Sequence, residues 1–256
     1  MSVTDLTARG EVSINGLSKS YSINGNHLSV LNGFSNQIRA GESLAIVGAS
    51  GSGKTTLLRV LAGLEEADQG EVVIDGRPIR GVGADRAVIF QEPRLLPWLS
   101  VLDNVAFPLE NRGLKKADAR ARAQRYVDLV SLSDFSDALP AHLSGGMAQR
   151  VGIARALAVK PEILLLDEPF GALDAMTKIT MQEELSRIWR EERITMVLVT
   201  HDLEEAIFLA DRVLILPKEK GRRTKEIEID LPRPRSRSEA RFVRFREQLL
   251  NEFGLH

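Results

Sequence analysis

The sequence predicts an α/β fold that combines a mostly parallel β-sheet with an antiparallel β subdomain and a helical insertion. The first observation is a set of apolar runs of strand length, each followed by a glycine or polar residues. Unbroken runs of Leu, Ile and Val are typical of parallel strands that are buried on both faces. The runs and the residues after them are 43–47 with Gly48, 163–166 with Asp167, and 196–199 with Thr200 and His201.

The second observation is that helical segments separate these runs. Residues 54–62 follow the first run, and Met181, Leu185, Ile188 and Trp189 recur on one helix face between the second and third. Alternating strands and helices predict βαβ units, with helices on both faces of a parallel sheet. Because ligands bind beyond the carboxyl ends of such strands, we expect the polar residues after the three runs to share one site.

Two regions depart from the βαβ pattern. Residues 115–132 and 146–159 have helical character, which predicts a helical insertion over about residues 92–160. The first forty residues and residues 71–75 are β-branched, and Asn-Gly pairs are typical of tight turns. We therefore expect antiparallel strands interrupted at these pairs. The pairs are residues 15–16, 24–25 and 32–33.

Composition narrows the class of protein. Cysteine is absent, so disulfides and thiolate metal sites are excluded. The net charge is −1, which argues against the basic footprint that broad nucleic-acid binding needs. The N-terminus carries no apolar signal-peptide core, and no apolar run approaches the length of a membrane span. We expect a soluble chain.

We expect one domain over residues 1–216, followed by a basic extension over residues 217–256 with no motif to assign. A run of charged residues usually forms a solvated face, and we favour that interpretation here. Contact with anionic lipid head groups is the alternative.

A glycine-rich segment between the first apolar run and the first helix matches the pattern G-x-x-x-x-G-K-[ST]. Its backbone N–H groups would surround phosphates, Lys54 would reach the β and γ oxygens, and the Thr55 hydroxyl would bind Mg²⁺. A plain glycine-rich turn is the other interpretation, and the flanking strand and helix favour phosphate binding. The segment comprises Gly48, Ala49, Ser50, Gly51, Ser52, Gly53, Lys54 and Thr55.

Four side chains at the other strand ends complete a candidate hydrolytic site. Asp167 would hold Mg²⁺ through water, and Glu168 would act as general base toward the attacking water. His201 could bind the γ-phosphate, and the Gln91 amide could ligate Mg²⁺. Taken alone, each residue could equally be a polar residue at a strand end, a helix cap or a polar residue without a functional role.

A second candidate anion site lies in the segment LSGGMAQR, residues 143–150. Ser144 is a good helix cap, and Gly145 and Gly146 leave backbone N–H groups exposed at the start of a helix. Such a helix end attracts an anion, although the chain already has a phosphate loop almost a hundred residues earlier.

These motifs, in this order, resemble the nucleotide-binding subunit of ABC transporters over roughly the first 215 residues. The resemblance implies a P-loop NTPase core that binds ATP and Mg²⁺ and hydrolyses ATP. Met147 departs from the commoner pattern, in which Gln follows the two glycines. The matching parts are Tyr21 (adenine stacking), Gly48 to Thr56 (Walker A), Gln91 (Q-loop), Ser144, Gly145 and Gly146 (signature), Asp167 and Glu168 (Walker B), Asp174 (D-loop) and His201 (switch histidine).

The resemblance also implies the partners. In this family two chains pack head to tail, so that the signature of one closes the ATP site of the other. The homodimer would lie at the cytoplasmic face of the plasma membrane, beneath two permease subunits, with an external solute-binding protein and no nucleic acid. Residues 91–109 resemble the importers of nitrate, aliphatic sulfonates and taurine. For Trp98, core packing and docking to the permease are both open.

Two other functions remain open at this point. The same ATPase unit occurs in clamps that act on DNA or ribosomes, although such proteins usually carry long coiled coils or two cassettes. It also occurs as the separate ATPase subunit of exporters. Specificity for the transported solute belongs to other chains.

Overall fold

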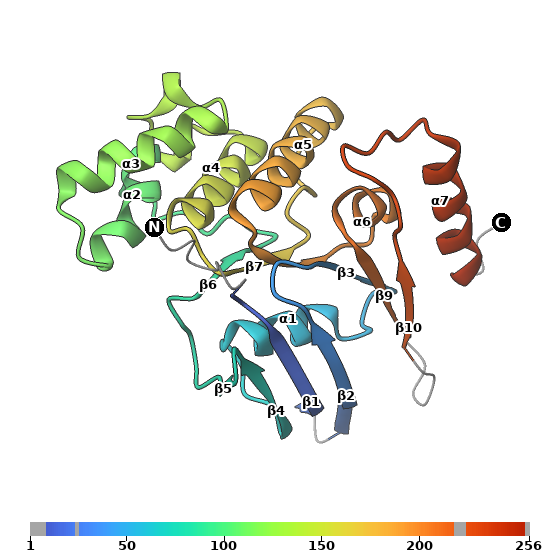
Figure 1. The fold of residues 1–256 in the computed structure, drawn as a ribbon. Helices are drawn as coiled ribbons and strands as arrows, with labels where there is room; N and C mark the ends of the chain where they lie inside the picture. The colour runs from blue at the N-terminus through green and yellow to red at the C-terminus, as the bar shows by residue number, and fades with distance from the viewer. Residues whose placement is uncertain (1–8, 24–25, 218–223, 254–256) are drawn as a thin grey trace, which may run out of the picture.

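The computed structural model describes residues 9–23, 26–217 and 224–253. Its elements are arranged around two β-sheets (Figure 1). In the larger sheet five strands are parallel, and the edge strand at one side is antiparallel to its neighbour. The strand order is β10 (Lys225–Glu228), β9 (Arg212–Leu216), β3 (Ser43–Gly48), β8 (Thr195–Val199), β7 (Ile163–Asp167) and β6 (Arg86–Ile89).

The smaller sheet is antiparallel, in the order β2 (Asn26–Ile38), β1 (Val12–Ile23), β4 (Gln69–Ile74) and β5 (Arg77–Pro78). Two of the Asn-Gly pairs lie inside β1 and β2, so the prediction that they interrupt the strands is wrong. Gly16 and Gly33 have φ of 58° and 62°, and the pairing register of the two strands shifts beside them. Each pair therefore makes a β-bulge rather than a turn. The pair at residues 24–25 lies outside the described residues.

Side chains of the large sheet alternate between two apolar clusters, one on each face. In β7, Leu164 and Leu166 join one cluster, and Ile163 and Leu165 join the other. Helix α1 (Lys54–Ala62) and the antiparallel sheet cover the second cluster. Full burial of a Leu or Ile side chain stabilises the fold by about 1.5–3 kcal/mol. The apolar side chains on both faces of each central strand therefore favour a position between the two clusters. This confirms the predicted burial of the apolar runs.

Helices cover the opposite face of the large sheet. In α3 the residues Ala119, Ala123 and Val127, spaced by four, are buried against the neighbouring helices. Ser100 caps the N-terminus of α2 by accepting a hydrogen bond from the backbone N–H of Asp103. The helices are α2 (Val101–Asn111), α3 (Lys116–Leu129), α4 (Gly145–Ala158), α5 (Ala175–Glu192), α6 (Leu203–Leu209) and, at the C-terminal end, α7 (Ala240–Glu252). Figure 1 shows α2, α3 and α4 gathered at one end of the molecule and α7 at the other.

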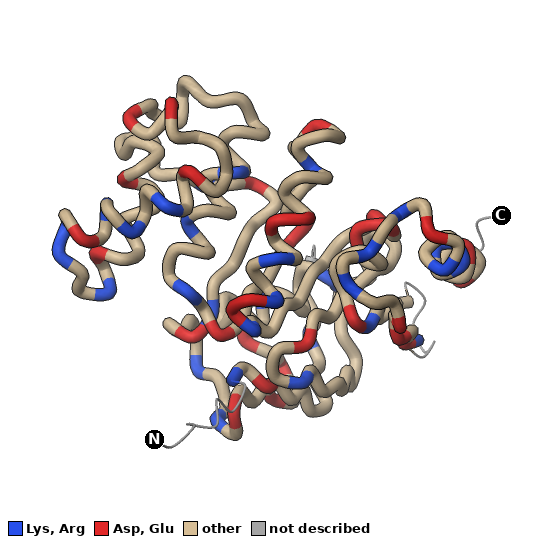
Figure 2. The backbone as a smooth tube through the Cα atoms, turned by 45° about the horizontal axis from the view of Figure 1, so that its top comes forward, with Lys and Arg blue, Asp and Glu red and all other residues tan. Residues whose placement is uncertain are grey.

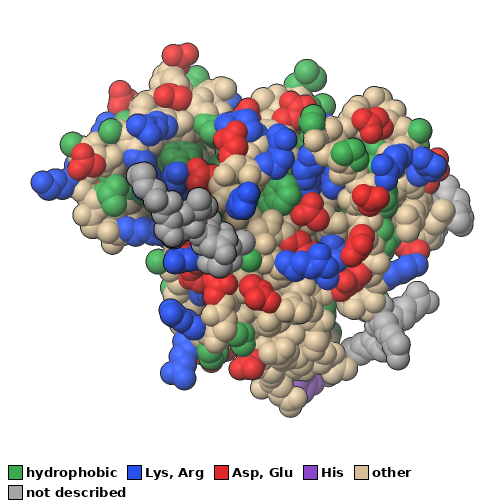
Figure 3. All heavy atoms as spheres, viewed as in Figure 1, with side chains coloured by type: hydrophobic (Ala, Val, Ile, Leu, Met, Phe, Trp, Pro, Cys, Tyr) green, Lys and Arg blue, Asp and Glu red, His purple; other side chains and the backbone are tan. Residues whose placement is uncertain are grey.

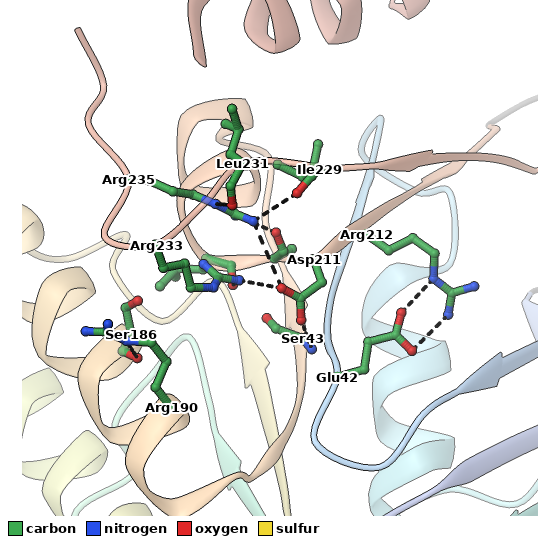
Figure 4. Close-up of polar contacts among 12 residues, drawn as sticks. Glu42, Ser43, Ser186, Arg190, Asp211, Arg212, Ile229, Leu231, Arg233 and Arg235 are labelled. Carbon is green, nitrogen blue, oxygen red and sulfur yellow. Dashed lines mark hydrogen bonds and ion pairs between the residues drawn. The ribbon is translucent and has the colours of Figure 1, made fainter. Parts of the chain in front are cut away.

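The basic extension is part of this fold in its described residues, because β10 pairs with β9 and α7 packs against α6. The prediction of a solvated basic face is wrong for Arg233 and Arg235. Figure 4 shows both side chains pointing toward Asp211, and the Arg233 guanidinium donates to an Asp211 carboxylate oxygen at 2.8 Å. Arg235 is 8% exposed and donates to backbone carbonyl oxygens, among them those of Ile207 and Ala210 at the end of α6.

Charged residues of both signs are mixed along the described backbone (Figure 2) and over the face seen in Figure 3. This agrees with the nearly neutral net charge of the sequence.

Among the described residues, no helix combines the length and the apolar character needed to span a membrane.

Candidate active site

The glycine-rich loop joins β3 to α1, and its backbone conformation requires glycine at two positions. A Cβ on Gly48 would lie 2.6 Å from the carbonyl oxygen of Leu216, and a Cβ on Gly53 would lie 2.9 Å from Val30. Gly53 also has φ of 94° and precedes α1 without any side-chain cap. The N–H groups of the first turn of α1 are therefore available to an anion.

The other loop residues are arranged around that helix end. Ala49, Ser50 and Gly51 are exposed, whereas the Ser52 side chain is buried. Within the described residues, the Ser52 hydroxyl has no hydrogen-bond partner. A buried hydroxyl without a partner is costly, so a ligand oxygen that bonds to it would be favoured.

Lys54 is the buried cation of this loop, with 8% exposure. Its Nζ donates hydrogen bonds to the carbonyl oxygens of Gly48 and Ala49, at 2.8 and 3.0 Å. Burial lowers the pKa of Lys54, and the nearby carboxylates of Glu168 and Asp167 oppose that shift. The ammonium is thus held by carbonyl oxygens of its own loop, which phosphate oxygens can replace.

Asp167 ends β7 directly beside the loop. The Thr55 hydroxyl donates to its carboxylate at 3.2 Å. Burial raises the pKa of Asp167, and the neighbouring Glu168 adds to this shift. A cation at this position would stabilise the ionised carboxylate that burial disfavours.

The structure brings Gln91, Glu168 and His201 together from three different strand ends. A Glu168 carboxylate oxygen lies 3.2 Å from Nδ1 of His201 and 3.4 Å from the side-chain nitrogen of Gln91. Glu168 has a left-handed backbone with φ of 45°, and its N–H donates to the carbonyl of Val199 on β8. The His201 side chain is 71% exposed, so a ligand can reach it.

Tyr21 reaches the loop from β1. Its hydroxyl lies 3.5 Å from that of Thr56 in the first turn of α1, and it donates a hydrogen bond to Glu65. Burial and the hydrogen bond to Glu65 raise the pKa of Tyr21. The ring therefore lies at the edge of the phosphate loop, where the Lys19 ammonium is 5.5 Å from its centroid.

The structure does not join the signature segment to the phosphate loop. Ser144 caps α4, its hydroxyl accepting from the N–H of Met147 at 3.2 Å, and Ser144 and Gly145 are exposed while Gly146 is partly so. Helix α4 contributes to the apolar cluster on one face of the large sheet and α1 to that on the other. Asp174 caps α5 and is also exposed, and its hydrogen bonds with Thr177 lower the pKa of its carboxyl.

Sequence reasoning missed two polar residues that connect parts of this site. Gln149 is 1% exposed, and its amide donates to the carbonyl oxygens of Phe90 and Pro169, which lie next to Gln91 and Glu168. Lys178 bonds with residues that follow His201. A polar residue on an otherwise buried face of α4 is the signal that could have identified Gln149.

Known proteins match this chain in sequence. Residues 31–171 match the family described as ABC transporter. An uncharacterised ABC transporter ATP-binding protein of Methanocaldococcus jannaschii is 45% identical over 94% of this chain and 90% of its own length. A taurine import ATP-binding protein of Pseudomonas aeruginosa is 44% identical, covering 93% of each chain. An aliphatic sulfonates import ATP-binding protein of Bacillus cereus is 43% identical over 94% of this chain and 95% of its own.

Solved structures match the fold. A dimeric ATP-binding cassette in a post-hydrolysis state, bound to ADP and Pi, has a TM-score of 0.79 and 31% identity, covering 86% of this chain and 100% of that chain. A second dimeric structure, of a bacterial ABC transporter cassette, has the same TM-score and 32% identity. These neighbours confirm the predicted fold class. The chain belongs to the family of ABC transporter ATP-binding proteins, and it is an ATPase that binds ATP.

Proposed function

We propose that this chain powers the import of a small anion, such as a taurine-like compound, an aliphatic sulfonate or nitrate, through a separate permease. The observation that carries this proposal is the similarity of nearly the whole chain to the taurine and aliphatic sulfonate import proteins. Both relatives with a substrate in their names are import proteins, which favours import over export and over a clamp on DNA or ribosomes. The mixed charges in Figures 2 and 3 are the supporting observation for proposing no nucleic-acid partner, since broad binding of nucleic acid needs a basic surface.

The proposed reaction converts ATP and water into ADP and phosphate. Lys54 exchanges its loop carbonyls for β- and γ-phosphate oxygens. Glu168 accepts a proton from the attacking water. His201, whose Nδ1 lies 3.2 Å from a Glu168 carboxylate oxygen, would bind the γ-phosphate. Tyr21 would stack on the adenine, as the family resemblance implies, and its hydroxyl lies 3.5 Å from that of Thr56 in the first turn of α1.

The residues present fit a bound Mg²⁺. Thr55 and Asp167 offer a hydroxyl and a carboxylate oxygen, which are the hard ligands that this ion prefers, and Gln91 can add an amide oxygen. Few protein ligands are expected, since Mg²⁺ usually keeps several waters and binds phosphate oxygens. When bound, the ion would neutralise charge on the β- and γ-phosphates.

The proposed dimer accounts for the second anion site. Ser144, Gly145 and Gly146 lie at the exposed start of α4, and α4 and α1 pack on opposite faces of the sheet. A head-to-tail partner could bring its own signature to this chain's γ-phosphate, with Asp174 at the same interface. The two solved neighbours are dimers, which supports this arrangement.

An apolar groove is the proposed contact with the permease. It has a volume of 350 Å³, and its lining includes Leu64, Val82, Leu96 and Phe107. Trp98 is 71% exposed, so core packing, the first alternative for this residue, is wrong. We propose that Trp98 and this groove dock the permease. The dimer would then lie peripherally at the cytoplasmic face of the plasma membrane, with a solute-binding protein outside.

The test is a pull-down of the tagged full chain from membranes, followed by ATPase assays of the recovered complex in vesicles. We expect a permease to co-purify and one of taurine, an alkanesulfonate or nitrate, with its binding protein, to stimulate turnover. Glu168→Gln should abolish turnover, and Trp98→Ala should remove the stimulation while leaving the ATPase activity of the isolated chain. Recovery of rRNA or DNA without a permease would contradict the proposal.

A further inference from the structure

A cluster of ionic side chains at the start of α6 lies outside the residues assigned above. The Lys178 ammonium is 2.7 Å from an Asp202 carboxylate oxygen and 2.6 Å from a Glu205 carboxylate oxygen. The Glu205 side chain is 4% exposed and that of Lys178 is 26% exposed. One cation thus bridges two carboxylates in a partly dry environment, where charge pairs are strong.

The same cluster holds both neighbours of His201 in the chain. The Thr200 hydroxyl donates to Glu205 at 2.5 Å and accepts from the N–H of Asp202 at 3.0 Å. The other Asp202 carboxylate oxygen accepts from the N–H of Glu205 at 3.2 Å and so caps α6. The backbone on each side of His201 is therefore fixed by hydrogen bonds.

His201 itself has little to hold it. Its side chain is 71% exposed, and within the described residues its ring makes a polar contact with Glu168. An exposed imidazole takes its position from the backbone that carries it. The position of the ring beside Glu168 thus depends on Thr200 and Asp202.

Lys178 brings a second element into this arrangement. It lies on α5 one turn after Asp174, which caps that helix at an exposed position. The backbone N–H of Lys178 donates to the Asp174 carbonyl at 2.8 Å, so the two residues are joined through the first turn of α5. Through the Lys178 side chain, the start of α5 is joined to the segment after β8 that carries His201.

We propose that Lys178 is a positioning residue for ATP hydrolysis, which ties α5 to Asp202 and Glu205 and thereby holds His201 beside Glu168. The proposal rests on the roles of Glu168 and His201 in the proposed function. Lys178 touches neither the nucleotide loop nor Glu168 in the contacts of the described residues. Its effect is therefore on turnover rather than on ATP binding.

The charges of the cluster support a specific role for the ammonium. Burial alone would lower the pKa of Lys178, but its hydrogen bonds to Asp202 and Glu205 raise it overall. Burial raises the pKa of Glu205, and Lys178 opposes that shift. Lys178 is thus charged, and its ammonium also compensates the buried Glu205 carboxylate. A test must therefore separate the positioning of His201 from the compensation of this charge.

The test compares Lys178→Met, Lys178→Arg and the double variant Lys178→Met/Glu205→Gln. We expect Lys178→Met to lower kcat by at least about tenfold, with KM for ATP changed by less than about twofold. Lys178→Arg should recover most of the turnover, because it restores a cation. Lys160→Met is the matched control, since Lys160 pairs with Glu192 at an exposed position, and we expect wild-type kcat.

The double variant removes the uncompensated buried charge. We expect it to recover the melting temperature and to keep the low kcat, because Asp202 still lacks its partner. Wild-type kcat in the double variant would overturn the proposal, since Lys178 would then only neutralise Glu205. This variant also remains informative if Lys178→Met fails to fold.

A double-mutant cycle with His201→Ala tests the route of the effect. If Lys178 acts through His201, adding Lys178→Met to His201→Ala causes no further loss of kcat. A further tenfold loss would overturn the proposal. Failure of the proposed function gives a different result, in which His201→Ala alone hydrolyses ATP at the wild-type rate.

Discussion

Two buried cations, Lys54 in the proposed ATP site and Arg235 in the C-terminal segment, have the same exposure but different surroundings. Each is 8% exposed. Lys54 bonds with two carbonyl oxygens of an exposed loop. Burial and the nearby Arg233 lower the pKa of Arg235 to about 9. The guanidinium of Arg235 donates to backbone carbonyl oxygens of two segments. Those of Ile229 and Leu231 are seen in Figure 4, and the others belong to Ile207, Phe208 and Ala210.

The difference shows that burial alone does not identify a functional charge. The carbonyl groups at the end of α6 have no helical partners of their own, so Arg235 satisfies them within the fold itself. The carbonyls around Lys54 belong to a loop that faces an open helix N-terminus. Lys54 can therefore exchange its partners for those of a ligand, whereas Arg235 cannot.

Replacing each cation by methionine, which keeps most of the apolar stem, separates these two cases. The larger effect is expected on ATP turnover with Lys54→Met, where kcat/KM should fall by about 10²–10³-fold. The unfolding free energy without nucleotide should change by less than about 1 kcal/mol. Steady-state ATPase assays and urea unfolding measure both quantities. Unchanged turnover would refute the assignment of Lys54 to the phosphate site.

Arg235→Met should produce the opposite pattern. It leaves several buried carbonyl oxygens without donors, so the unfolding free energy should fall by about 2–4 kcal/mol. KM for ATP, measured below the lowered melting temperature, should change by less than about twofold. Arg244→Met on the exposed side of α7 is the control, with an expected change of less than about 0.5 kcal/mol. Equal stability of both variants would contradict the structural role of Arg235.

A smaller effect is expected at Asp167, a partly buried carboxyl that we propose to bind Mg²⁺. Burial raises the pKa of this carboxyl, so the folded protein without nucleotide holds the proton more tightly than the unfolded chain does. Ionisation of Asp167 thus opposes folding as the pH rises through this raised pKa. Asp167→Asn should therefore stabilise the nucleotide-free protein at pH 7.5, by up to about 1 kcal/mol, and abolish Mg²⁺-dependent turnover.

Thermal unfolding at two pH values checks this prediction. The difference in melting temperature between Asp167→Asn and the wild type should narrow at pH 4.5, because the wild-type carboxyl then begins to bind its proton. The same difference at both pH values would mean that ionisation of Asp167 is not its cause.

The sequence predicted those parts of the fold whose signals are local. The apolar runs correspond to β3, β7 and β8 within one residue at each end, and α1 has the predicted bounds. The Asn-Gly pairs at residues 15–16 and 32–33 were a wrong signal, because strand pairing across β1 and β2 accommodates the positive φ of each glycine as a bulge. Tertiary pairing here overrides the local turn preference.

The site was predicted where its residues adjoin strand ends, and it was missed where contacts are distant in sequence. Gln91, Glu168 and His201 each follow a strand of one sheet, so topology alone brings them together. Lys178 and Asp202 are 24 residues apart on different helices, and no periodicity connects them. The carbonyl partners of Arg235 are likewise up to 28 residues away, which is why a basic run looked solvated.

We propose that LSGGMAQR of one chain completes the ATP site of another, and a mixture of two defective chains can show this directly. One chain carries Lys54→Met and the other carries Ser144→Arg, which places a bulky side chain where the partner's γ-phosphate would bind. In a head-to-tail heterodimer one site has both defects and the other has none. If the signature served its own chain, every site would have one defect.

The measurement is ATP-dependent dimer formation, by light scattering, with Glu168→Gln in both chains to slow hydrolysis. Each variant alone must be folded by thermal unfolding. We expect the mixture to form more dimer at saturating MgATP than either variant alone, because one intact site is restored. No gain of dimer on mixing would contradict it and would assign the signature to the ATP site of its own chain.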